Sequence, residues 1–186
     1  MFFTVIYCNY ENKGKIINMK HATFGAGCFW CIEAIFDHLD GIIDIQVGYS
    51  GGTTKNPNYE QVCKGNTGHA EVIQVAFDPL LISYNKLLKT FWESHDPTSL
   101  NRQGADYGTQ YRSVIFYHDK EQNKIASEAK DLLDNTGIYT NPIVTEIKPL
   151  DIFYKAEEYH QDYYNKNKNA PYCKMVIQPK INLLFK

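Results

Sequence analysis

Apolar and polar residues alternate along the chain with two different periods. Short apolar stretches, typical of strands, lie at 20–27, 42–52, 70–78, 111–119 and 142–150. Apolar residues recur every three or four positions, as in helices, at 29–41, 84–95, 120–135 and 155–167. Because the two kinds of segment are mixed in order, the pattern predicts a single α/β domain around one sheet.

Turn and capping residues mark the ends of several of these elements. Ser83 is a typical N-cap for the helix that follows it, and Pro97 ends that helix. Asp119 and Gln122 have the spacing of a capping box. Gly41 is a good C-terminal breaker for the first helix. These signals support the predicted helices independently of their apolar periodicity.

Three segments show no strong period. Residues 53–69 and 96–110 are polar and contain glycine, so they are predicted to be long ordered loops, the first with a helical turn at 59–63. The stretch 169–186 is predicted to be an extended tail. Long loops inside a compact domain are usually functional, which makes the first two segments candidates for carrying site residues.

Composition and charge narrow the class of protein. A chain of 186 residues fits one domain with a sizeable core, and a net charge of −2 offers no basic surface for nucleic acid. No apolar run approaches the ~20 residues needed to span a bilayer. The five cysteines are odd in number and unevenly spaced, which argues against a secreted disulfide framework and favours a cytoplasmic protein.

The first residues look like an addition to the domain. Residues 1–18 lack the basic region of a signal peptide, and Met19 directly precedes the first clear strand. We therefore expect 1–19 to be an N-terminal extension, which includes Cys8. Residues 20–186 are expected to form one catalytic domain, with a C-terminal tail from about residue 166.

The stretch TFGAGCFWCIEAIF, residues 23–36, carries the strongest candidate for chemistry. Cys28 lies where a glycine turn meets the start of a helix, and a helix N-terminus favours the thiolate. Phe29 and Trp30 can wall an apolar pocket suited to a small group such as a methyl. The ordinary alternative is a buried structural thiol with core aromatic neighbours.

Cys31 has three interpretations. It can pair with Cys28 as a CxxC redox couple, contribute to a zinc site, or lie buried in the helix. Zinc usually takes four ligands, and the remaining histidines and cysteines follow no recognised zinc spacing. A general thiol–disulfide oxidoreductase and a zinc-binding module are therefore the competing classes at this stage.

Several further motifs follow in order along the chain. GCFWC is followed by VGYSGG, NPNYEQVCKGNTGHAE, HDPTSLNRQGADYGTQYRS, AEEYHQDYY and PYC. From about Thr23 to Lys180 these motifs resemble the A-type peptide methionine sulfoxide reductases. The resemblance implies a two-layer α/β sandwich with a mixed β-sheet and a ferredoxin-like core, much loop and an irregular C-terminal tail.

The resemblance also implies a role for each matching residue around the thiol. Cys28 matches the nucleophile, and Phe29 and Trp30 match the aromatic wall that holds the sulfoxide methyl. Asp106 matches a site residue that helps to bind substrate through its backbone nitrogen.

Three other residues match the family's side chains that interact with the sulfoxide oxygen. Glu71 matches the acid, and Tyr59 and Tyr111 match the hydroxyls that hydrogen-bond this oxygen. Negative charge builds on the oxygen when a thiolate attacks the sulfur, so donors must meet it there. Because a carboxylate cannot donate, Glu71 is expected to be protonated, with its pKa raised by burial.

The implied substrate is methionine-S-sulfoxide, free and in proteins, and the implied intermediate is a sulfenic acid on Cys28. Thioredoxin is the expected reductant, with no bound cofactor or metal, and a monomer with no nucleic-acid or membrane partner is expected. The second thiol departs from the family pattern: Cys173 on a mobile tail is the expected resolving cysteine, with Cys31 as the alternative. Cys63 is expected to be structural.

Overall fold

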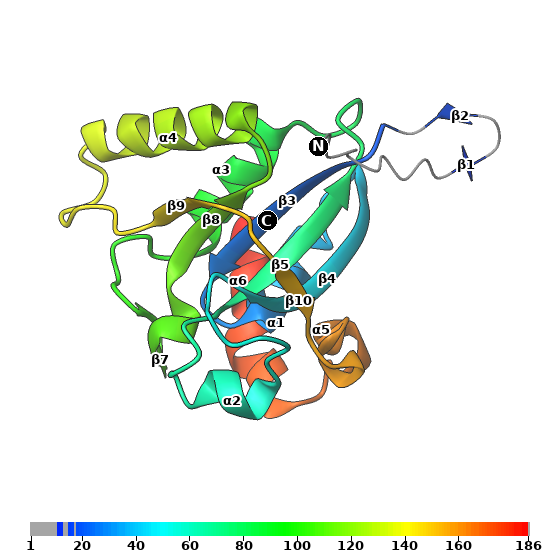
Figure 1. Cartoon of the computed structure of the whole chain (residues 1–186), viewed down its shortest axis with the longest axis vertical. Coiled ribbons are helices and arrows are strands. Elements are labelled where there is room, and N and C mark those ends of the chain that lie inside the picture. Colours follow the sequence, from blue (N-terminus) through cyan, green and yellow to red (C-terminus); the bar gives the residue numbers. More distant parts are fainter. Residues whose placement is uncertain (1–10, 13–14, 17, 186) are drawn as a thin grey trace.

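The structure, a computed structural model, describes residues 11–12, 15–16 and 18–185. At its centre is a six-stranded mixed sheet with the strand order β10-β4-β5-β3-β8-β9 (Figure 1). In that order the strands span Phe153–Lys155, Ile42–Ser50, Ala70–Phe77, Lys20–Ala26, Ser113–Tyr117 and Glu146–Pro149. Neighbouring strands are antiparallel except β8 and β9, which run parallel.

The central elements follow the order βαββαβ. They are β3, α1 (Phe29–Phe36), β4, β5, α3 (Tyr84–Ser94) and β8. Their strands lie side by side as β4-β5-β3-β8 and are all antiparallel, which is the ferredoxin-like arrangement. The predicted mixed sheet with a ferredoxin-like core is therefore confirmed.

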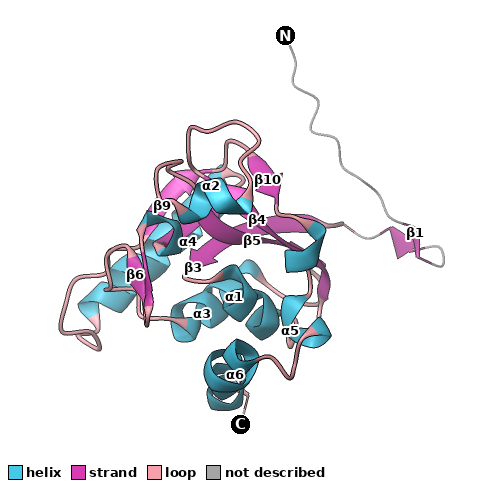
Figure 2. Ribbon diagram, turned by 90° about the horizontal axis from the view of Figure 1, so that it is seen from below, coloured by secondary structure: helices cyan, strands magenta, loops and turns pink. Residues whose placement is uncertain are grey.

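Helices cover one face of this sheet. Helices α1 and α3 pack on the central strands, and α4 (Lys120–Asn135) packs beside α3 on β8 and β9. Helix α6 (Gln178–Leu184) lies beneath α1 and α3, on their side away from the sheet (Figure 2). The C-terminal helix thus adds a partial third layer to the two expected ones.

Aromatic side chains fill the space between sheet and helices. Phe24 of β3 packs against Phe36 and Phe91, with ring centroids 5.5 Å and 5.2 Å apart, and all three rings are buried. Full burial of one such side chain stabilises the fold by roughly 1.5–3 kcal/mol. This core fixes α1, and with it the stretch that starts at Cys28, on the sheet.

Capping groups begin the helices largely as predicted. The Ser83 hydroxyl accepts the Lys86 N–H at 3.2 Å, and the Asp119 carboxylate accepts the Gln122 N–H at 2.8 Å. The capping box predicted at Asp119 is incomplete. The Gln122 side chain accepts the N–H of His118 at 3.0 Å, one residue earlier than a capping box requires.

Both predicted loops contain short elements. Residues 53–69 include α2 at Tyr59–Cys63, which coincides with the predicted helical turn and begins with a capping box between Asn58 and Gln61. Residues 96–110 contain a two-stranded hairpin and the start of a 3-10 turn, at Arg102–Gln103 (β6), Asp106–Tyr107 (β7) and Thr109–Tyr111.

The C-terminal segment is helical, and the prediction of an extended tail was wrong. A π-helical turn at Cys173–Ile177 leads directly into α6. Cys173, Ile177 and Ile181 recur every four residues and are all buried, so one face of the segment packs on the core. Pro179, in the first turn of α6, has no N–H to donate to the π-helical turn that precedes it.

The segment 155–167 also differs from its prediction as one helix. It forms a 3-10 turn at Glu158–His160 and a short helix, α5, at Tyr163–Lys166. Asp162 separates the two with a left-handed backbone (φ 54°, ψ 40°) that a continuous helix cannot contain. Strand β10 was not predicted.

The N-terminal extension predicted at 1–19, with Cys8, lies largely outside the described residues. Within it the structure describes Met19, the residue before it, and the two strands of a short hairpin, β1 at Glu11–Asn12 and β2 at Lys15–Ile16. No helix among the described residues is long and apolar enough to cross a membrane.

Candidate active site

The fold places Cys28 at the junction that the sequence predicts. It is the N-cap residue of α1, directly after β3, and only 9% of it is exposed. Gly27 forms the turn before it with φ +87°, and a Cβ atom there would approach the Gln103 side chain to 2.6 Å. Glycine is therefore required at this position, both for its backbone and for the close approach of β6.

Glu71 faces the start of the same helix. It lies in β5, is 1% exposed, and its carboxylate accepts the N–H of Phe29 at 3.1 Å. Burial raises its pKa to about 8, with the charges of Asp106 and Cys31 acting in the same direction. At neutral pH this carboxyl group is mostly protonated, and a protonated carboxyl can donate a hydrogen bond.

Two tyrosine hydroxyls share the surroundings of Glu71. Tyr59 begins α2, and Tyr111 ends the 3-10 turn after β7. Burial raises the pKa of both phenols, and the negative charge of Glu71 raises it further. Both tyrosines therefore stay neutral donors at physiological pH. The structure brings Cys28, Glu71, Tyr59 and Tyr111 together from four separate segments.

Aromatic rings line the same end of α1. The Phe29 and Trp30 ring centroids lie 6.1 Å apart, and Tyr59 stacks on Phe29 at 6.5 Å. His160 lies among these rings, 5.0 Å from Phe29 and 5.5 Å from Trp30. On its other side Trp30 stacks face to face on Tyr163, with centroids 3.7 Å apart. This arrangement is an apolar wall beside the nucleophile.

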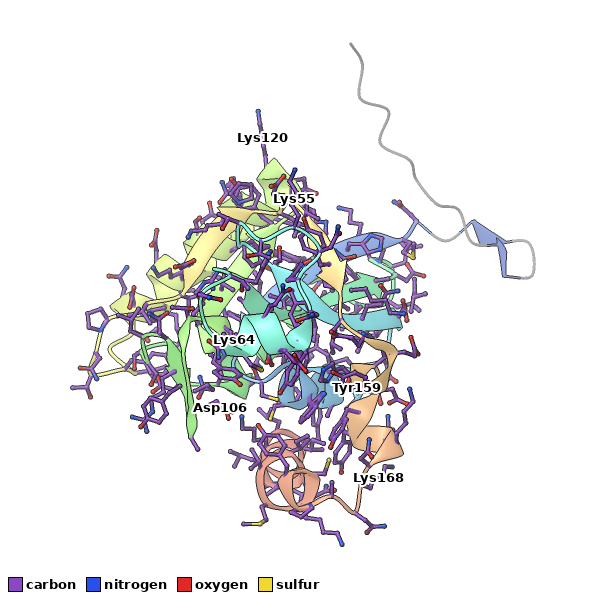
Figure 3. The ribbon with its side chains drawn as sticks, turned by 60° about the horizontal axis from the view of Figure 1, so that its bottom comes forward. Lys55, Lys64, Asp106, Lys120, Tyr159 and Lys168 are labelled. Carbon is purple, nitrogen blue, oxygen red and sulfur yellow. The ribbon has the colours of Figure 1, made fainter. Side chains whose placement is uncertain are left out.

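Tyr172, which the sequence analysis did not single out, links the Asp106 carboxylate to the thiol of Cys31. The hydroxyl of Tyr172 donates to Asp106 at 3.2 Å and lies 3.6 Å from the sulfur of Cys31. Figure 3 shows Asp106 and Tyr159 on opposite sides of this region, with α2 above and the C-terminal helices below. His160, Tyr163 and Tyr172 all belong to the quoted motifs AEEYHQDYY and PYC, which were the signal available in the sequence.

The thiols of Cys28 and Cys31 interact with each other. Burial raises the pKa of Cys28, contrary to the simple expectation from its helix N-terminal position. Contact with Cys28 lowers the pKa of Cys31 to about 7, and the positive charge of Lys180 also lowers it. The buried pair therefore holds its first negative charge mainly on Cys31.

The other two described cysteines differ from this pair. Cys173 is completely buried, and both burial and the charge of Cys31 raise its pKa. Cys63 is exposed at the end of α2, and its thiol interacts with Tyr59. Among the described residues, no group of three or more His, Cys, Asp or Glu side chains is arranged to hold a metal ion.

A cysteine nucleophile beside a protonated acid, with a second thiol one helical turn away, is typical of a thiol-dependent oxidoreductase. Comparison with known proteins places the chain within that class. A sequence model of the family described as peptide methionine sulfoxide reductase matches residues 20–186. The chain belongs to this family, and it is an oxidoreductase.

Individual relatives agree with this assignment. The chain is 52% identical over 168 residues to peptide methionine sulfoxide reductase MsrA of Sulfolobus acidocaldarius, covering 90% of this chain and 94% of the relative. It is 54% identical over 157 residues to the protein of that name from Methanosarcina acetivorans, covering 84% and 82% of the two chains.

Solved structures also resemble the chain. Reduced Mxr1 from Saccharomyces cerevisiae superposes with a TM-score of 0.78 at 39% identity, covering 83% of this chain and 89% of Mxr1. Mxr1 in complex with Trx2 superposes with a TM-score of 0.56 at 30% identity, covering 75% and 82%.

Proposed function

We propose that this enzyme reduces methionine-S-sulfoxide, free and in proteins, and that Cys28 is its nucleophile. The observation that carries the proposal is the buried, mostly protonated Glu71, held by the N–H of Phe29 directly after Cys28. An acid in this position can neutralise an oxygen while the adjacent thiol attacks the sulfur to which that oxygen is bound.

The chemical step follows from this geometry. Cys28 passes its proton to the Cys31 thiolate and attacks the sulfoxide sulfur, while Glu71 gives its proton to the sulfoxide oxygen and Tyr59 and Tyr111 donate hydrogen bonds to it. The sulfur–oxygen bond breaks, the oxygen passes to Cys28 as a sulfenic acid, and methionine leaves. The sulfoxide gains two electrons, and Cys28 loses two.

Substrate binding uses the other predicted residues. Phe29 and Trp30 would enclose the methyl group on the sulfoxide sulfur, because their rings form the apolar wall next to Cys28. The backbone nitrogen of Asp106 would bind the substrate.

The decisive assay measures turnover of the two separated sulfoxide epimers with dithiothreitol. The S epimer is expected to react and the R epimer to remain. Cys28→Ser should abolish turnover, whereas Glu71→Gln should lose much less because glutamine still donates a hydrogen bond. Equal activity on both epimers, or activity that survives Cys28→Ser, would show that the proposed chemistry is wrong.

The second thiol is the part of the proposal that the structure changes most. We propose that Cys31 condenses first with the Cys28 sulfenic acid, forming a disulfide and releasing water, and that Cys173 then exchanges with Cys31. Cys31 lies one helical turn after Cys28, which supports the first step, and Cys173 is buried in a turn that packs on α1, which supports the second. A direct Cys28–Cys173 bond would require the buried C-terminal segment to move.

Disulfide mapping after one equivalent of substrate separates these routes. A Cys28–Cys31 bond should accumulate in Cys173→Ser, and the sulfenic acid should persist in Cys31→Ser. A Cys28–Cys173 bond that forms at the wild-type rate in Cys31→Ser would return the resolving role to Cys173 alone.

Recycling by a thioredoxin-type dithiol completes the cycle, because disulfide exchange with a dithiol restores both thiols. The complex of the relative Mxr1 with Trx2 supports this reductant. A general thiol–disulfide oxidoreductase is the second candidate, favoured by the lowered pKa of Cys31 in its CxxC pair. Reduction of insulin disulfides at a rate comparable to sulfoxide turnover would support that candidate.

We also propose a cytoplasmic monomer whose catalytic domain is residues 20–186. The uneven spacing of the cysteines, and the free thiols of the four that the structure describes, support a reducing compartment. Sedimentation of the reduced protein should give a mass near 21.4 kDa. A variant lacking residues 1–18 should retain full activity.

A further inference from the structure

Helix α1 carries a buried carboxylate that the proposed chemistry does not use. Glu33 lies on α1 and is only 5% exposed. Its two oxygens accept the N–H groups of Asp162 and Tyr163, at 2.7 Å and 3.2 Å. Burial raises the pKa of Glu33 to about 7, so the carboxylate prevails above neutral pH, where hydrogen bonds to a charged acceptor are worth more than neutral ones and link α1 to α5.

The segment that Glu33 binds cannot hold its conformation by local interactions alone. Asp162 has a left-handed backbone, which costs an ordinary residue roughly 1 kcal/mol or more. Helix α5 has only four residues and no side-chain cap of its own. The Glu33 carboxylate supplies the missing acceptor for its first N–H groups, and the Asn165 amide adds a bond to Asp37 of α1 at 3.0 Å.

Tyr163, whose N–H is bound by Glu33, also contacts Trp30 of the proposed substrate pocket. Its ring stacks on Trp30 with centroids 3.7 Å apart and planes only 9° from parallel. The indole N–H of Trp30 is buried and donates to no protein group among the described residues. The orientation of the indole therefore depends on ring packing, in which Tyr163 is the most closely stacked neighbour.

We propose that Glu33 is a positioning residue that, through Tyr163, sets the plane of the Trp30 ring and thereby the size of the pocket for the sulfoxide methyl. The link from Trp30 to substrate rests on the function proposed above. The link from Glu33 to Trp30 does not, because it follows from contacts between protein groups alone.

The test uses Trp92→Phe as the parent protein, since the chain has two tryptophans and Trp30 then becomes the only one. Glu33→Gln is expected to change the Trp30 emission and increase its quenching by acrylamide. Glutamine keeps one acceptor but turns an N–H toward backbone donors. KM for methionine-S-sulfoxide should rise roughly tenfold with kcat within about twofold, because the loss is in binding.

Substrate selectivity provides a readout that a general loss of stability would not change. Ethionine sulfoxide is longer than methionine sulfoxide by one methylene on sulfur, and pockets discriminate such a difference by roughly 10–200-fold. The parent is expected to prefer the methyl substrate within that range. The preference should fall several-fold in Glu33→Gln.

Four further variants test whether Glu33 acts on Trp30 through Tyr163. Tyr163→Ala should reproduce the changes in Trp30 fluorescence, KM and substrate selectivity. Tyr163→Phe, which keeps the ring, should match the parent in all of them. The double variant Glu33→Gln/Tyr163→Ala should differ from the parent in fluorescence, KM and selectivity no more than Tyr163→Ala alone does, because both substitutions act through the same contacts. Glu128→Gln, at an exposed glutamate on α4, should change nothing.

The outcomes separate the two proposals. If Trp30 emission and quenching are unchanged in folded Glu33→Gln, the positioning role is wrong, whatever happens to activity. If the parent does not reduce sulfoxides but the fluorescence changes occur, the positioning role stands and the proposed function fails. If Glu33→Gln does not fold, the comparison of Tyr163→Ala with Tyr163→Phe decides, and equal emission and selectivity in these two would overturn the proposal.

Discussion

Replacing Glu71 with glutamine should remove a large pH dependence from the stability of the protein. The carboxyl group is buried in the native state, where its pKa is about 8, against 4.5 for an exposed glutamate. Glutamine has almost the same shape, carries no charge at any pH, and can still accept the Phe29 N–H through its oxygen. The substitution therefore isolates the effect of ionising a buried group.

The size and direction of the effect follow from these pKa values. Because the native pKa is the higher one, the favourable contribution is complete below about pH 4.5 and is lost as the pH rises through about 8. Each pKa unit corresponds to about 1.36 kcal/mol, so the full loss is about 5 kcal/mol. Glu71→Gln should then gain in stability relative to wild type across this window, by several kcal/mol at its upper end.

Urea unfolding of both reduced proteins, from about pH 5 to about pH 9, measures this difference directly. Groups common to both proteins, including His95 and His118 with their lowered pKa values, largely cancel in the comparison. A parallel pH dependence of the two unfolding free energies would refute the reasoning. In turnover, the fall in wild-type activity that accompanies deprotonation near pH 8 should also be absent from the variant.

Three further predictions concern other parts of the structure. Ser83→Ala removes the acceptor for the Lys86 N–H and should lower the free energy of unfolding by about 1 kcal/mol, measured in urea against Ser127→Ala as the control. Ile181→Ala removes a buried side chain that anchors α6 and should cost about 2–5 kcal/mol. It should also speed alkylation of Cys173 by iodoacetamide, and unchanged alkylation would contradict the anchoring role. Tyr172→Phe removes a hydroxyl that lowers the pKa of Cys31, so this pKa should rise, as measured by the pH dependence of its alkylation followed by mass spectrometry.

The sequence predicts those parts of the fold in which local signals agree with tertiary contacts. Strand β3 and the cap at Ser83 lie where the sequence predicts them, and α1 begins at Phe29 as predicted. It ends at Phe36, however, five residues before Gly41, the predicted breaker. Strand β10 has only three residues and little pattern of its own, since its pairing with β4 creates it. The break at Asp162 likewise depends on a distant partner, the carboxylate of Glu33.

The candidate site shows the same division. Cys28, Phe29 and Trp30 are adjacent in one motif, and their common location could be inferred from it. Placing Glu71 beside them requires the pairing of β3 with β5. Phe29 and Glu71, which this pairing brings together, are 42 positions apart in the sequence. The contact of Tyr172 with Cys31 spans 141 positions and depends on a helix that the prediction described as an extended tail. Apolar residues four apart, from Cys173 to Ile181, were the signal that this prediction did not weigh.

The contact between Tyr172 and the Cys28–Cys31 pair also has a consequence for synthesis of the chain. Cys31 is synthesised 141 positions before the tyrosine that contacts it, and Cys28 earlier still. At about 5–20 residues per second, roughly 7–28 seconds separate the two events. During this interval the nascent chain has the thiols that oxidants attack but not the C-terminal helices that cover them in the finished protein. Nascent chains of this reductase should therefore be more sensitive to peroxide at Cys28 and Cys31 than completed molecules.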